Sequence, residues 1–272
     1  TTLSENHWAF QEIKKPNLPS KESFFDGKLK GFAKNDIDHF VLAKLDEKKL
    51  FPSRPADRWS LIRRAYFDLT GLPPTWEEVR AFQQDESPSA FEKVIDKLLA
   101  SQQYGERWGR YWLDVARYAD TSGQDNRRGQ SGEFIYAWTY RNWVIGALNQ
   151  DKPYDQFLTE QIAADRLLAK DMTKNKFSQA AMGFLTLGRR DRNQQEVIDD
   201  RIDVVTRGTM GLSVYCARCH NHKFDPVPTA DYYSLYGVFN SSQEPKEEDK
   251  PILLVSDKTT ELLINPQYRE YK

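Results

Sequence analysis

Only two cysteines, four histidines and three methionines occur among the 272 residues of this chain. Because a structural zinc site usually takes two well-separated pairs of ligands, the absence of a second cysteine pair weighs against such a site. An excess of one charge is also lacking, since 39 basic and 40 acidic residues leave a formal net charge of -1. This balance gives no electrostatic case for binding nucleic acid or an anionic membrane. No apolar run reaches the length of a membrane span, so we expect no span in this chain.

Aromatic residues, by contrast, are plentiful, with seven Trp, 13 Tyr and 15 Phe. Such side chains bury a large area each, and they can also line a flat aromatic cofactor. Charged residues make up 29% of the chain and are mixed in sign, which is typical of solvated helix faces and ion pairs. The length suffices for one large domain, or for two subdomains with a substantial core.

Both cysteines lie in one short motif, Cys216-Ala217-Arg218-Cys219-His220. Two thiols separated by two residues and followed at once by a histidine are the attachment signature of a c-type haem. Each sulfur would add across one vinyl group of the porphyrin, and the histidine would then lie under the ring with a nitrogen on the iron. We therefore predict one covalent haem c, attached through Cys216 and Cys219, with His220 as an iron ligand.

Three other interpretations of the motif are open. A zinc site would have to use Cys216, Cys219, His220 and His222, which are crowded into a single short stretch. A thioredoxin-like redox pair expects a βαβ context, which the flanking sequence does not show. A plain structural disulfide leaves the adjacent histidine unexplained. The haem interpretation accounts for all three motif side chains.

Hydrophobic periodicity along most of the chain is that of helices, so we predict an all-α fold, an irregular multi-helix domain. Thr75 and Glu78 form a capping box at one helix start. A short strand is possible at 252–255. Helices are predicted near 36–45, 61–69, 88–99, 104–120, 136–148, 154–168, 177–187, 194–215 and 229–239, and a further helix is predicted to begin at Thr75.

The chain divides into three parts by composition. Residues 1–34 are expected to be an extended arm packed on the body, because prolines and glycines interrupt any helix there. Residues 35–240 are the predicted helical haem c domain, with possible subdomains 35–130 and 131–240. Residues 241–272 are expected to be a linker and the start of a following segment.

Two polar stretches are further candidates for a site. The loop 121–132 carries oxygen ligands, but its spacing is not that of a calcium loop, and a surface excursion is the simpler interpretation. The basic turn 188–192 could pair with haem propionates, for which guanidinium groups are suited, or could simply be solvated.

The chain resembles the planctomycete-type cytochrome c domain, a family catalogued as a domain of unknown function. The resemblance covers the chain from His7 to about Asn240. It implies a secreted or periplasmic location and a larger parent protein with a separate small cytochrome c domain and another uncharacterised domain. It implies no activity, so no catalytic residue carries over; Cys216, Cys219 and His220 carry over as the attachment pair and the proximal ligand. The stretches that agree are His7–Phe10, Pro55–Thr75, Tyr104–Trp108, Arg117–Asp120, Pro153–Phe157 and Cys216–Pro226.

The second axial ligand of the iron decides between electron transfer and small-molecule chemistry. We rank His7, on the arm, as the first candidate, and Met182 as the second. His222 is too close to His220 to reach the opposite face of the haem easily, so we expect it to fix the loop by hydrogen bonding. His39 is expected on the polar side of its helix. A packing role for the aromatic cluster around His7 is the simpler alternative.

The preferred function is extracytoplasmic electron transfer to or from a redox partner domain or protein. A haem enzyme acting on a peroxide or a carbohydrate is the alternative, because the chain is much longer than the roughly 100 residues of a small domain. A binding domain with a structural haem is a third interpretation. Covalent haem attachment takes place outside the cytoplasm, and no signal peptide is visible at Thr1, so we expect a mature or excised part of a periplasmic or extracellular protein.

Overall fold

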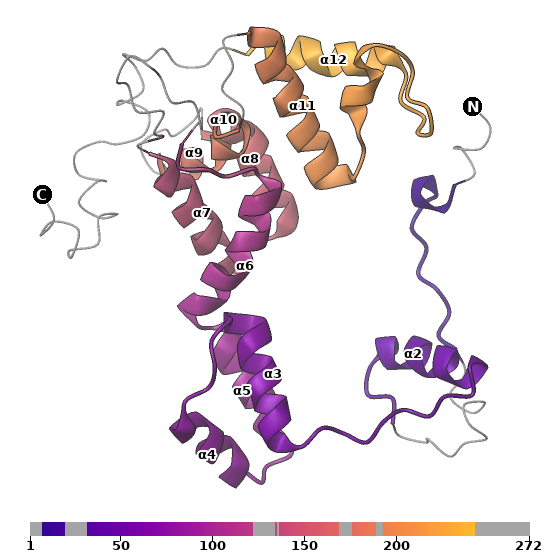
Figure 1. The fold of residues 1–272 in the computed structure, drawn as a ribbon, viewed down its shortest axis with the longest axis vertical. Coiled ribbons are helices and arrows are strands. Elements are labelled where there is room, and N and C mark those ends of the chain that lie inside the picture. The colour runs from indigo at the N-terminus through magenta and orange to yellow at the C-terminus, as the bar shows by residue number, and fades with distance from the viewer. Residues whose placement is uncertain are drawn as a thin grey trace, which may run out of the picture. The chain divides into compact units, whose positions relative to one another are not determined.

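The computed structural model describes residues 7–19, 32–121, 134, 136–168, 176–188 and 193–242. These residues form helices and connecting loops, with no β-strand among them (Figure 1). The predicted all-α fold class is therefore confirmed. The possible strand at 252–255, the linker from residue 243, nearly all of the polar loop and the arginines of the basic turn lie outside the described residues.

The chain divides into two compact units, Thr1–Leu61 and Ile62–Lys272. In the first unit the 3₁₀ turn η1, Trp8–Phe10, is followed by irregular backbone through residue 19. Helix α2, Asp36–Glu47, begins at a reciprocal capping box between Asn35 and Asp38. Such a box satisfies backbone N–H groups that the first turn of a helix leaves unpaired.

Helix α2 corrects one prediction from the sequence. His39 was expected on the polar side of this helix, but it is 3% exposed, whereas Ile37 is 71% exposed. The helix packs through Leu42, which contacts Ala33 and Leu45, and this contact turns the His39 side inward. Local periodicity could not show this, because the helix carries apolar residues on more than one face.

The second unit contains most of α3 and all the later helices (Figure 1). The Thr75–Glu78 capping box is present at the start of α4, with the Thr75 N–H donating to Glu78 at 2.9 Å. The element bounds are α3 Arg58–Thr70, α4 Trp76–Gln84, α5 Ala90–Leu99, α6 Gln102–Val115, α7 Ala137–Asn149, α8 Tyr154–Leu168, α9 Lys176–Gln179, η3 Ala180–Met182, α10 Gly183–Thr186, α11 Gln194–Met210, η4 Val214–Arg218 and α12 Thr229–Asn240.

A large aromatic core lies between α6, α7, α8 and α10. Trp112 packs on this core, and its indole N–H donates to Gln161 Oε1 at 2.7 Å. The Tyr140 hydroxyl donates to the same oxygen at 2.7 Å. Helices α6 and α7 approach closely at Gly105, where an added Cβ would meet the Ile145 carbonyl oxygen at 2.5 Å. Glycine is therefore required at this crossing.

A second, smaller core holds the cysteine motif in place. It is formed by buried apolar side chains of α11, η4, α12 and the loop before α12, namely Ile198, Ile202, Val214, Ala217, Val227 and Tyr232. The sequence predicted one helix from 194 to 215, but α11 ends at Met210. Gly211 follows in the left-handed conformation, with φ of 69°, and ends the helix as a C-terminal glycine commonly does. The motif is thus carried by the separate turn η4.

Candidate functional site

Cys216 lies in the 3₁₀ turn η4, Val214–Arg218, and Cys219 directly follows this turn. Because such a helix has three residues per turn, side chains three apart in sequence lie on the same face. Val214 and Ala217 form the buried face, whereas Cys216 and Cys219 are both exposed and free. At a rise of about 2 Å per residue, the two cysteines are separated by about 6 Å along the turn.

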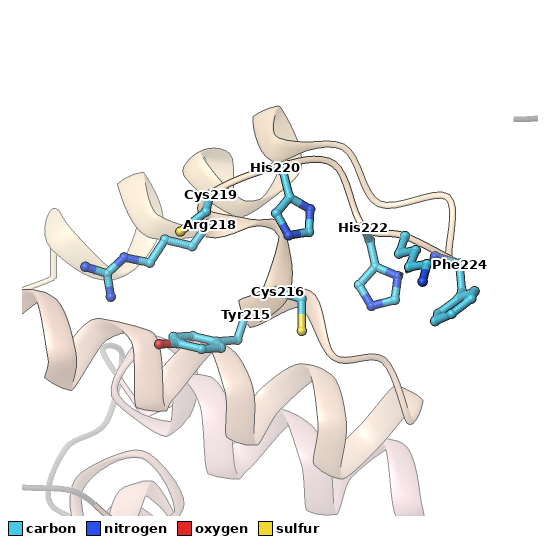
Figure 2. Close-up of a pocket in the computed structure, with 8 residues that line it drawn as sticks. Tyr215, Cys216, Arg218, Cys219, His220, His222 and Phe224 are labelled. Carbon is cyan, nitrogen blue, oxygen red and sulfur yellow. Dashed lines mark hydrogen bonds between the residues drawn. The ribbon is translucent and has the colours of Figure 1, made fainter.

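Both thiols open into a hollow of about 410 Å³. Ligand pockets in proteins commonly enclose about 300–1,000 Å³, so this hollow has room for part of a large cofactor. In the close-up, the His220 ring lies between Cys219 and His222, and the Cys216 side chain points into the space below it (Figure 2). The hollow is lined by Tyr215, Cys216, Arg218, Cys219, His220, His222, Lys223 and Phe224.

His220 presents one ring nitrogen for binding. Its Nδ1 lies 2.8 Å from the backbone carbonyl oxygen of Asn221. A carbonyl oxygen only accepts hydrogen bonds, so Nδ1 carries the proton and Nε2 keeps its lone pair. The ring is exposed. A backbone hydrogen bond that fixes the tautomer in this way is common for histidines that bind metals.

His222 lies on the same hollow, but the loop uses both of its nitrogens. Its Nδ1 accepts hydrogen bonds from the backbone N–H groups of Asp225 at 2.8 Å and Phe224 at 3.3 Å. Nε2 therefore carries the proton and donates to Ser213 Oγ at 3.1 Å. The side chain is only 7% exposed. The prediction that His222 fixes the loop is confirmed.

Arg218, the residue just before the second cysteine, connects the motif to α11. Its guanidinium donates to Asp199 and lies 3.4 Å from Glu196 Oε1. Asp199 is 3% exposed and also accepts a hydrogen bond from the hydroxyl of the fully buried Tyr232. Burial and then this hydrogen bond raise the pKa of Tyr232. Burial alone would lower the pKa of Arg218, but Asp199, Glu196 and Tyr232 together raise it, so the guanidinium stays charged.

The donor set fits a covalent haem better than a bare metal ion. Within the described part of the chain, no three His, Cys, Asp or Glu side chains cluster closely enough to hold a metal ion. The porphyrin supplies four nitrogens to its iron, so a haem needs only one or two ligands from the protein. An exposed His220 with a free Nε2, which lines the same hollow as two exposed thiols, meets that requirement.

The candidates for the second axial ligand lie in different elements. His7 caps η1, where its Nδ1 accepts a hydrogen bond from the Ala9 N–H at 3.3 Å and its ring lies 5.7 Å from that of Trp8. Within its own unit this cluster stays exposed, since Trp8 is 81% exposed. Met182 is half-buried in η3 and does not line the hollow.

Sequence reasoning missed the partners of Arg218. Anions interact favourably with the start of a helix, and this general effect accounts for Glu196 in the first turn of α11. However, Asp199 follows the N-cap Asn193 by more than one turn, beyond the reach of that effect. The available signal was an acidic residue next to Ile198 and one helical turn before Ile202, in a chain with an arginine between its two cysteines.

The fold and site define an α-helical domain that presents a Cys-x-x-Cys-His turn beside an open hollow. Residues 36–244 match the model of the family described as "PSCyt2: Protein of unknown function (DUF1549)". The match covers well over half of the chain, and the chain therefore belongs to this cytochrome-related family of unknown function. No curated protein and no solved structure gave a significant match. Among the described residues, no helix is both long enough and apolar enough to span a membrane.

Proposed function

We propose that this chain is a monohaem c-type cytochrome domain that transfers electrons outside the cytoplasm. Cys216 and Cys219 hold the haem through thioether bonds, and His220 binds the iron through Nε2. In each attachment the thiol adds across a vinyl group. A carbon–sulfur bond forms, the π bond is lost and the thiol hydrogen passes to the other vinyl carbon, so no oxidant is needed. When bound, the haem supplies an iron that gains or releases one electron.

The observation that carries this proposal is the hydrogen bond that fixes the tautomer of His220, in the same hollow as the two thiols. Its Nδ1 is held by the Asn221 carbonyl at 2.8 Å, which leaves Nε2 free for iron. A disulfide or a thiol redox pair would not require a histidine fixed in this tautomer. The two exposed cysteines line the same hollow, so a single rigid ring can meet both sulfurs.

For electron transfer, the iron needs a second strong ligand, and we propose His7. His222 does not serve, because both of its nitrogens are engaged in the loop. Replacement of His7 by alanine should change a low-spin ferric spectrum into a high-spin one. The replacement Trp8→Ala, which alters the neighbouring ring but keeps the imidazole, is the matched control. An H7A protein with the wild-type spectrum would show that His7 is not the ligand.

A haem enzyme is the second candidate, favoured by one observation. The only other histidine that lines the hollow is committed to hydrogen bonds, so the lining itself offers no free second imidazole. If no ligand comes from elsewhere, one position of the iron stays open to a small molecule such as a peroxide, or faces an extracellular carbohydrate.

The deciding experiment is intact-mass analysis of the protein produced in a host able to mature c-type cytochromes. We expect one added tetrapyrrole in the wild type, and none held covalently in a protein that carries both Cys216→Ala and Cys219→Ala. A visible spectrum then separates the two candidates. Low-spin iron that does not bind carbon monoxide supports electron transfer, whereas high-spin iron that binds it supports the enzyme. An unmodified wild-type mass would refute both.

The proposed location is the periplasm or the extracellular space, because haem c is attached there. The proposed partner is a redox domain or protein, which the larger parent implied by the resemblance would supply. Chemical cross-linking of the reduced and oxidised full-length parent, followed by peptide mapping, would test whether a second redox domain meets residues of the hollow such as Phe224.

A further inference from the structure

The turn that carries the two cysteines is joined to the body by a pair of opposite charges. The Arg218 guanidinium donates to one carboxylate oxygen of Asp199, and the Tyr232 hydroxyl donates to the other. Asp199 is 3% exposed and Tyr232 is fully buried, so this contact is shielded from water. Charges that are partly removed from water interact more strongly and are less screened by salt.

Further hydrogen bonds fix the same guanidinium. The Arg218 guanidinium lies 3.4 Å from the Glu196 carboxylate. When the amide of Gln195 is oriented with its oxygen toward Arg218, this oxygen accepts hydrogen bonds from Arg218 Nη2 at 2.9 Å and from Arg218 Nε at 3.2 Å. The Tyr233 hydroxyl lies 3.4 Å from the Arg218 carbonyl oxygen. Both the side chain and the backbone of this residue are therefore held by α11 and α12.

The position of Arg218 gives this pair a consequence beyond stability. Arg218 is the residue just before Cys219 and lines the same hollow as the two thiols and His220. Asp199 lies behind it, on the core side. A fixed cation beside a redox centre disfavours the oxidised form, which carries one more positive charge, and a fixed anion favours it. Hydrogen bonds and charges around the ring are among the features by which a protein sets a haem potential.

We propose that Arg218 and Asp199 are positioning residues that hold the attachment turn and, as a compensated pair of charges, set the reduction potential of the haem. This inference rests on the proposed function. It predicts effects of opposite sign from the two partners. Loss of the Asp199 charge leaves the Arg218 cation with only the more distant Glu196 carboxylate and raises the potential, whereas loss of the Arg218 charge leaves the Asp199 carboxylate unpaired and lowers it.

The test is redox titration of four haem-loaded proteins: the wild type, Arg218→Met, Asp199→Asn and the double variant. We expect a lower potential for R218M, a higher potential for D199N and a value near the wild type for the double variant. Arg218→Lys keeps the cation and should restore most of the wild-type potential. Lys223→Met removes an exposed cation from the same hollow, and solvent screening should leave its shift smaller than that of either single variant.

The outcomes separate this inference from the proposed function. A wild type without added tetrapyrrole mass refutes the function, and this inference with it. A loaded wild type whose R218M and D199N variants shift in the same direction, or not at all, refutes this inference alone. D199N keeps the size of the side chain, so if R218M does not load, the sign of the D199N shift decides. If neither variant folds, as judged by circular dichroism, the pair serves the fold and not the potential.

Discussion

Replacement of His222 by alanine tests whether the two histidines of the motif loop have separate roles. The imidazole of His222 makes hydrogen bonds to Ser213 Oγ and to the backbone N–H groups of Phe224 and Asp225. A typical hydrogen bond contributes about 0.5–1.5 kcal/mol net, and the ring is nearly buried. Because the weaker bonds contribute less, we expect a destabilisation of about 1–3 kcal/mol, measured by urea unfolding.

The H222A variant also tests a prediction about the spin state of the haem iron. H222A should still carry covalent haem, with the spin state of the wild type, because both nitrogens of His222 are engaged in hydrogen bonds of the loop. The matched variant His220→Ala should lose that spin state even where the thioether bonds form. The reverse pattern, in which H222A changes the spin state and H220A does not, would refute the tautomer argument based on the Asn221 carbonyl.

Two predictions concern the stability of the helical body. Burial alone would raise the pKa of Glu78, but hydrogen bonds from Lys97, the Thr75 N–H and Tyr66 together lower it to about 2. Because the folded pKa lies below the unfolded value, ionised Glu78 stabilises the folded protein above pH 4.5. After allowance for solvent screening, we expect a contribution of about 1–2 kcal/mol to the free energy of unfolding, which is lost as the pH falls toward 2. The Tm difference between the wild type and Glu78→Gln should shrink over that range, and a constant difference would contradict the assignment. Gly105→Ala should destabilise the protein by about 1–3 kcal/mol through its clash with α7. Gly237 has open space around it, so Gly237→Ala should be neutral or stabilising by up to about 1 kcal/mol. If the two alanine variants change the thermal unfolding equally, the α6–α7 crossing at Gly105 is not tight.

Features that depend on a few neighbouring residues could be predicted from the sequence. The Thr75–Glu78 capping box lies within a short stretch, and local chemistry determines it. The role of His222 could be predicted because the loop after the motif is too short for its imidazole to reach far. These inferences needed no knowledge of distant contacts.

Features that depend on which face of a helix is covered could not be predicted. His39 is buried although it is polar, because Leu42 turns that side of α2 inward. The end of α11 at Met210 was missed because the apolar period continues through Leu212 and Val214. Only the left-handed backbone at Gly211 separates the helix from the next turn, and glycine allows this conformation without demanding it.

The two consecutive acidic residues of α11 connect the turn η4 to the large helical body. Neighbouring residues on an α-helix point about 100° apart, so Asp199 and Asp200 meet different partners. Asp199 pairs with Arg218 of the turn, whereas Asp200 accepts from Arg117, beyond the end of α6, at 2.7 Å. The apolar residues of α11 divide in the same way, since Ile198 packs in the small core around the turn and Val204 in the large aromatic core. Helix α11 is therefore held from both sides. The aromatic core of α6, α7, α8 and α10 acts on the site through this helix, because it fixes the position of the carboxylate to which Arg218 is bound.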